Sequence, residues 1–152
     1  MAEVLFYHLE RARLETVLPE LLEKSLQRGW KAVVRAGAAE TVAWLDEKLW
    51  TFRDDSFLPH SADPDPKTAA RQPIWITTGA DRPNTAEILF VVDGARLDMG
   101  EIPDFARCVL IFDGADEAAI GAARALWKDI RGAGHAATYW RQGDAGRWEK
   151  QA

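Results

Sequence analysis

Short segments of strand length, most of them apolar at nearly every position, constrain the fold of this chain more than any other feature. Such runs are typical of strands covered on both faces, as in parallel sheets, because no position has to meet water. The segments between them carry apolar residues at helical spacing. The expected strands are residues 3–9, 31–36, 74–78, 87–92, 107–112 and 137–141, and the expected helices are residues 14–28, 38–52 and 116–131.

The alternation of strands and helices predicts a single α/β domain over residues 1–142. The expected fold is a Rossmann-like open, mostly parallel sheet with helices on both faces. Gly29 is expected to end the first helix, and the pair Gly132 and Gly134 to end the last. The remaining residues, 143–152, are polar and are expected to form a C-terminal tail.

Residues 53–73 form a long expected loop, because they show no periodicity and contain four prolines. Loops of this length often carry a function. His60, Asp63 and Asp65 in this loop could hold a hard cation or supply a general base, which makes a small metal-dependent hydrolase the alternative interpretation. A metal site needs further ligands at fixed spacing, which the sequence does not offer, and a solvated loop explains the same residues.

Nucleotide cofactors are not expected. The letters GAGHAA at residues 132–137 match a dinucleotide-binding fingerprint. They follow an expected helix and precede an expected strand, which is the reverse of the order in which such a site meets pyrophosphate. The sequence also contains no GxxxxGK[ST] loop that could hold phosphates. We therefore expect no cofactor.

The single cysteine, Cys108, lies in an apolar run, where a buried and unreactive thiol is the ordinary occupant. One cysteine cannot form an intrachain disulfide, which favours a reducing compartment. The sequence shows neither a secretion signal nor an apolar run of membrane-spanning length. These features predict a cytoplasmic protein.

Charge is unevenly distributed along a chain whose formal net charge is −5 and whose pI is near 5.2. Residues 1–121 hold 13 basic and 21 acidic side chains, whereas residues 122–152 hold 6 basic and 3 acidic. The acidic balance argues against sequence-independent binding of duplex DNA, which needs a strongly basic surface. The C-terminal part is a positive region on an acidic protein.

One flank of the helix in this positive region combines cations with apolar surface. Arg124 has Trp127 and Lys128 three and four positions further on, so the three side chains lie beside one another. Ile120 lies one turn earlier. A guanidinium beside an indole plane suits a peptide carboxylate together with an aromatic side chain. The alternative is a solvated flank whose tryptophan lies half in the core.

A second candidate surface involves Trp50, which points roughly 120° away from the apolar face of its helix. Phe57 and Leu58 follow in the long loop. Together these residues could form an apolar patch that anchors a protein partner. The alternative is that the loop folds back and covers Trp50.

The same segments carry a resemblance to the chi subunit family of the bacterial DNA polymerase III clamp-loader complex, and it extends over nearly the whole chain. The resemblance implies a Rossmann-like α/β fold without catalytic activity or nucleotide cofactor. Its motifs are FYHL near the start, LDEKLW at 45–50, SFLPH at 56–60, QPI at 72–74, an apolar run ending in IFDG, and ARALWK with YW downstream.

The resemblance further implies an adaptor that binds the acidic C-terminal tail of single-stranded-DNA-binding protein, which ends in Pro-Phe with a free carboxylate. The adaptor would touch DNA only through this partner. By matching positions, Arg124 would pair with the terminal carboxylate and would be flanked by Trp127 and Lys128. Ile120 and Phe112 would border the pocket for the phenylalanine ring.

Better-known members of the family differ from this chain at the pocket. They carry a lysine at the position of Ile120 and an apolar pair at the positions of Asp113 and Gly114. These differences predict a more apolar and less basic pocket, whose affinity for the tail depends less on salt.

Trp50, Phe57 and His60 match the family's other contact surface. In the family this surface receives the psi subunit of the clamp loader or a helicase related to the repair helicases.

Overall fold

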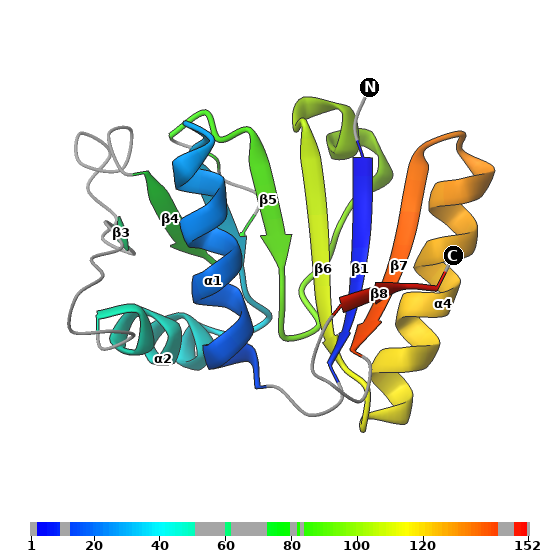
Figure 1. The fold of residues 1–152 in the computed structure, drawn as a ribbon, viewed down its shortest axis with the longest axis horizontal. Helices are drawn as coiled ribbons and strands as arrows, with labels where there is room; N and C mark the ends of the chain where they lie inside the picture. Colours follow the sequence, from blue (N-terminus) through cyan, green and yellow to red (C-terminus); the bar gives the residue numbers. More distant parts are fainter. Residues whose placement is uncertain are drawn as a thin grey trace.

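The computed structural model describes residues 3–9, 13–50, 60–61, 73–79, 82, 84–142 and 148–151. Within these residues, eight strands form one sheet in the order β3-β4-β2-β5-β6-β1-β7-β8 (Figure 1). The strands are β1 Glu3–Leu9, β2 Ala32–Arg35, β3 His60–Ser61, β4 Ile74–Thr77, β5 Ile88–Val91, β6 Arg107–Asp113, β7 Ala136–Gln142 and β8 Trp148–Lys150.

The pairing of these strands is parallel except between β7 and β8, which are antiparallel. The register places Phe6 of β1 between Leu110 of β6 and Tyr139 of β7. The central strands β2 and β5 are buried along their whole length, as the apolar sequences of β5 and of Ala32–Val34 indicate. The expected open, mostly parallel sheet is therefore confirmed.

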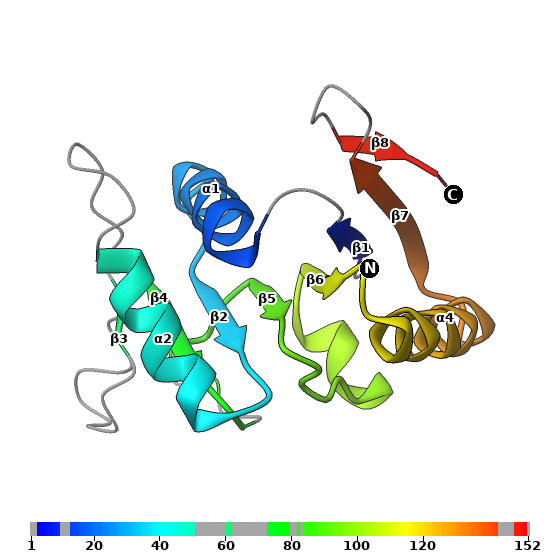
Figure 2. The same cartoon turned by 90° about the horizontal axis from the view of Figure 1, so that it is seen from below.

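Helices cover both faces of the sheet, as predicted (Figure 2). The helices are α1 Leu14–Gln27, α2 Ala39–Trp50 and α4 Glu117–Gly132, with a 3-10 helix, η1, at Met99–Asp104. Leu18 and Leu45 place α1 and α2 in a core on one face of the sheet. Ile102 and Ile130 place η1 and α4 in a second core on the opposite face. None of the described helices is long and apolar enough to span a membrane.

Local signals set the helix ends. The carboxylate of Asp116 accepts hydrogen bonds from the backbone N–H groups of Ala118 (3.0 Å) and Ala119 (3.3 Å), which caps α4. Gly29 follows α1 at φ +82° and Gly134 follows α4 at φ +88°, a backbone conformation that favours glycine. The segment GAGHAA thus ends α4 and leads into β7, as expected from the sequence.

Three elements were not predicted. Strand β3 lies inside the expected loop 53–73, and η1 lies in a segment for which no element was expected. Strand β8 lies inside the expected polar tail and pairs with β7 at the edge of the sheet. These elements are short and carry no periodic apolar pattern.

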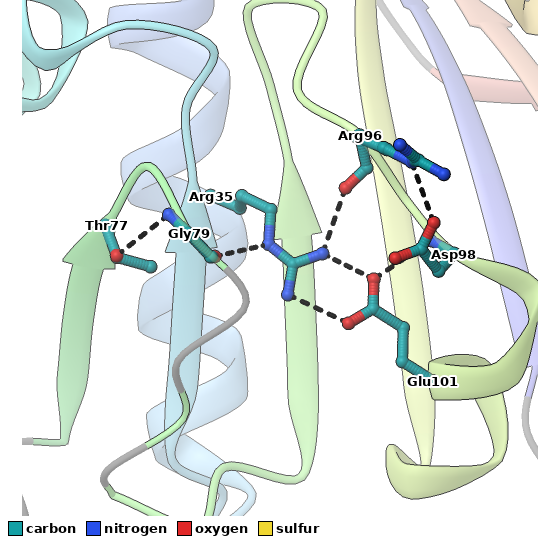
Figure 3. Close-up of polar contacts among 6 residues, drawn as sticks. All are labelled: Arg35, Thr77, Gly79, Arg96, Asp98 and Glu101. Carbon is teal, nitrogen blue, oxygen red and sulfur yellow. Dashed lines mark hydrogen bonds and ion pairs between the residues drawn. The ribbon is translucent and has the colours of Figure 1, made fainter.

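A buried ion pair joins η1 to the end of β2 (Figure 3). The Arg35 guanidinium donates to both carboxylate oxygens of Glu101, at 2.5 and 3.1 Å, and also to the backbone oxygens of Gly79 (2.8 Å) and Arg96 (3.0 Å). The Arg35 side chain is 5% exposed and that of Glu101 is 16% exposed. The pair ties three segments of the chain together at the carboxyl end of the sheet.

Candidate functional site

Five ring-bearing residues from three strands and one helix pack together on the α4 face of the sheet; we call them the aromatic cluster. The strand register brings together Phe6 and His8 of β1, Phe112 of β6 and Tyr139 of β7. Trp127 of α4 packs edge-on against Phe6, with ring centroids 5.4 Å apart, and against Tyr139 at 6.1 Å. Phe112 lies 6.0 Å from Tyr139. The structure therefore brings Phe112 and Trp127 into one group.

His8 lies in the part of the aromatic cluster nearest the carboxyl ends of the parallel strands. Its side chain is buried, and its Nδ1 lies 2.7 Å from the Tyr139 hydroxyl oxygen. Its ring packs edge-on against Phe112, with centroids 5.2 Å apart. A Cβ atom at Gly114 would overlap Nε2 of His8, so the turn after β6 needs glycine here. This close approach explains why glycine occupies position 114.

Arg124 and Lys128 extend the aromatic cluster toward solvent. Both are exposed, whereas Trp127 and Ile120 of the same helix flank are half-buried. Within the described part of the chain, the Arg124 side chain forms neither an ion pair nor a hydrogen bond. A guanidinium in this state is available to bind an anion. The arrangement on the helix is the one that the spacing predicted.

A cavity lies on the other flank of α4. It has a volume of about 690 Å³ and shares Phe112 with the predicted pocket, but it is not lined by Ile120, Arg124, Trp127 or Lys128. Its α4 wall is formed by Ala118, Ala119, Ala122, Ala123 and Leu126. The hollow beside Arg124 that the tail would occupy therefore stays a prediction.

The second predicted surface lies at the opposite edge of the sheet. Trp50 ends α2 and His60 begins β3, and the two elements contact each other. Figure 1 shows both elements at the β3 end of the sheet, far from α4. Phe57 and the side chains of Trp50 and His60 lie outside the described part of the structure. The side-chain contacts predicted for this surface stay predictions.

The residues of the alternative hydrolase interpretation fall largely outside the described part of the chain. This holds for Asp63, Asp65 and the side chain of His60. Among the residues that are described, no group of three histidine, cysteine, aspartate or glutamate side chains is placed to hold a metal ion. Cys108 is fully buried, and this burial raises the pKa of its thiol to about 12. The prediction of a buried core thiol is therefore confirmed, and its low reactivity stays a prediction.

The fold defines the chain as a Rossmann-like α/β protein, and its α4 face presents an exposed arginine beside an aromatic cluster. Residues 1–138 match the family model described as DNA polymerase III chi subunit, HolC. The chain belongs to this family, which connects it with DNA replication.

A curated relative supports the same assignment. The chain is 29% identical over 92 residues to a protein of Rickettsia prowazekii (strain Madrid E) named "Probable DNA polymerase III subunit chi". The match covers 60% of this chain and 55% of that protein, so the chain spans just over half the length of this relative.

Proposed function

We propose that this chain is a non-catalytic adaptor of the DNA polymerase III holoenzyme. It links the clamp loader to single-stranded DNA by binding the acidic C-terminal tail of single-stranded-DNA-binding protein. The observation that carries the proposal is Arg124, exposed and without an ion pair among the described residues, next to the aromatic cluster in a chain of the chi family. An adaptor of this kind needs a peptide-end receptor and does not need a reactive centre.

The proposed receptor recognises the carboxyl terminus of the tail peptide. The Arg124 guanidinium donates two parallel N–H groups to the terminal carboxylate, a geometry that a lysine cannot reproduce. The phenylalanine ring of the tail packs in the apolar region bordered by Ile120, Trp127 and Phe112, each of which is half-buried and so retains surface for a ligand. Lys128 adds charge attraction to the acidic residues that precede the ring.

The clamp-loader partner, or a repair helicase in its place, binds at the β3 edge through Trp50, Phe57 and His60. The support for this assignment is the place of α2 and β3 at the end of the sheet opposite α4 and β7. A partner at this edge leaves the α4 face accessible. The chain can then hold both partners at once.

Calorimetric titration with a synthetic tail peptide tests the receptor. We expect Arg124→Ala to weaken binding by about 1.5–3 kcal/mol, the range for hydrogen bonds to charged groups. A peptide with an amidated C-terminus should bind the unchanged chain more weakly by a similar free energy, because it lacks the terminal carboxylate. The matched control is Arg13→Ala, since Arg13 is 83% exposed and lies outside α4.

Two outcomes contradict the proposal: unchanged affinity in Arg124→Ala, or equal affinity for the free and the amidated peptide. Trp50→Ala gives the complementary readout, because it should abolish capture of the clamp loader or the helicase while tail binding stays intact. Loss of both activities in Trp50→Ala would indicate misfolding, which circular dichroism detects.

A further inference from the structure

A second pocket lies on the face of the sheet opposite the aromatic cluster. Its volume is about 370 Å³, and the carboxyl-terminal part of α1 and the strands β1, β5 and β6 line it. Three of its lining residues are cations, Lys24, Arg28 and Arg107, and none of its described lining residues is acidic. On a chain with a net charge of −5 this is a local excess of positive charge.

The cations of this pocket converge on one indole ring. The guanidinium carbon of Arg28 lies 4.8 Å from the ring centroid of Trp30, and that of Arg107 lies 5.4 Å from the same centroid. Arg107 pairs with Glu3, with 3.2 Å between Nη2 and Oε2. For the side chains of Lys24 and Arg28, the described residues provide no ion pair. Like charges that gather around one pocket, of which the described ion pairs compensate only Arg107, favour a bound anion.

Two further groups in the pocket are suited to donate hydrogen bonds. The Nε atom of Arg107 is buried and has no hydrogen-bond partner among the described residues. A buried donor in this state destabilises the fold, and an acceptor on a ligand would offset that cost. Tyr7 also lines the pocket, and burial raises the pKa of its phenol, so its hydroxyl keeps its proton. The pocket thus offers both positive charge and unused donors.

Aromatic side chains continue from the pocket across the sheet. The ring of Tyr7 is stacked at 6.4 Å on Trp140 of β7 and lies edge-on at 4.8 Å to Trp148 of β8. All three are half-buried. Figure 2 shows that α1 and α2 lie over the other half of this face, whereas β7 and β8 extend beyond them. We call these three residues, with Lys24, Arg28 and Arg107, the Tyr7–Trp148 face.

We propose that the Tyr7–Trp148 face binds a short stretch of single-stranded DNA, with phosphates at Lys24, Arg28 and Arg107 and bases against Trp140 and Trp148. A row of aromatic rings beside clustered cations is how proteins hold single strands without reading their sequence. A purely acidic peptide, which carries no ring, would use the cations alone and would leave the row of rings unused. The net negative charge of the chain argues against tight binding of duplex DNA, but local charge governs a site of a few nucleotides.

This inference does not rest on the proposed receptor at Arg124, because the two lie on opposite faces of the sheet. It adds a direct, weak contact between this chain and DNA to the indirect contact through single-stranded-DNA-binding protein. A chain held by the tail of a DNA-coating protein would meet the single strand at high local concentration, so a weak site suffices.

Fluorescence anisotropy of a labelled oligothymidylate of about 10 nucleotides, a length within the range that single-strand sites cover, tests the proposal on the full chain. With three cations at phosphates, affinity should fall about 20-fold between 50 and 200 mM salt, from the slope of about −0.7 per contact for single strands. In Arg28→Ala the affinity should be lower, and the fall between the same salt concentrations should be only about 7-fold.

Arg131→Ala is the matched control, because Arg131 also stacks on an indole, 5.6 Å from the Trp127 ring, but on the opposite face. It should leave the affinity for the oligonucleotide unchanged. Trp148→Ala should weaken binding about 5-fold or more, the lower end for loss of one stacked base, whereas Trp148→Phe should retain most of the affinity. Thermal unfolding of each variant shows that the fold is retained.

Two further ligands show whether binding requires a chain of nucleotides or only negative charge. Thymidine monophosphate should bind much more weakly than the oligonucleotide, because it spans one cation. Polyglutamate of equal length should not compete. The proposal is overturned if the oligonucleotide does not bind at 50 mM salt, if polyglutamate competes equally, or if Arg28→Ala and Arg131→Ala have the same effect.

Discussion

The buried pair of Arg35 and Glu101 provides the strictest test of how this fold is held together. Glu101→Ala removes two hydrogen bonds to the guanidinium and leaves its charge in a site where the side chain is only 5% exposed. Breaking a buried pair on one side costs about 3–5 kcal/mol, because the remaining charge has lost both water and partner. A domain of this size has about 5–15 kcal/mol of stability in total. The variant should therefore be folded but should have a much lower free energy of unfolding.

Urea unfolding followed by circular dichroism measures this loss. The free energy of unfolding in water should fall by about 3–5 kcal/mol, which is about 1.5–2.5 M in midpoint for a slope near 2 kcal/mol per M. The neighbouring pair of Arg96 and Asp98 is the control, since its side chains are 88% and 58% exposed. Arg96→Ala should cost less than about 1 kcal/mol, the usual value of a surface pair.

A second substitution distinguishes lost charge pairing from lost packing. Adding Arg35→Met to Glu101→Ala removes the uncompensated charge, so the double variant should recover part of the stability. If Glu101→Ala lowers the free energy of unfolding no more than Arg96→Ala does, the buried pair contributes no more than a surface pair, and the reasoning is wrong. If the double variant is less stable than Glu101→Ala, the cost comes from packing and not from charge.

Two other predictions concern the cap of α4 and the core thiol. Asp116→Ala should lower the free energy of unfolding by about 0.5–2 kcal/mol, because it removes the acceptor for two N–H groups, and Asp116→Asn should retain most of that energy. An equal loss in both variants would contradict the capping role. Cys108 should resist iodoacetamide at pH 8 until the chain unfolds, because burial raises its pKa from 9.0 to about 12. As pH rises from 9 to 12 the unfolded thiol ionises first, so the chain should lose stability relative to Cys108→Ala by at most about 1.4 kcal/mol per pH unit.

Much of the fold could be predicted from local sequence because the sheet is covered on both faces. A strand such as β6, Arg107–Asp113, has apolar residues on both sides, so burial leaves a continuous signal in the sequence. The same is true of the leucines of α1, which recur at helical spacing and pack in the core. In these elements the packing environment and the sequence pattern carry the same information.

The elements that were missed depend on contacts distant in sequence. Strand β8 holds one tryptophan among charged residues, and its pairing with β7 makes it a strand. Charged residues are common on edge strands, where they oppose pairing with other chains. Arg35 ends an apolar strand and can be buried because Glu101, 66 residues further on, pairs with it. No pattern within a short window encodes such a partner.

The candidate surfaces also differ in how much of each could be predicted from the sequence. Helical spacing predicted that Arg124, Trp127 and Lys128 share a flank, since all three lie on one element. The aromatic cluster beneath them required the register of β1, β6 and β7, and the Tyr7–Trp148 face required residues from α1, β1, β6, β7 and β8. Surfaces built from several strands are set by topology and not by spacing along the chain.

The sheet itself gives each of the proposed partners a separate place on one small domain. The crossover through α1 and that through α4 lie on opposite faces, so the two cores and the surfaces above them are separated by a layer of backbone. The strand order places β3 at one edge and β8 at the other, so a partner at Trp50 is separated by the width of the sheet from a ligand at Trp148. Partners that meet different faces and edges do not compete for space. The topology is thus compatible with the simultaneous binding that the proposed adaptor needs.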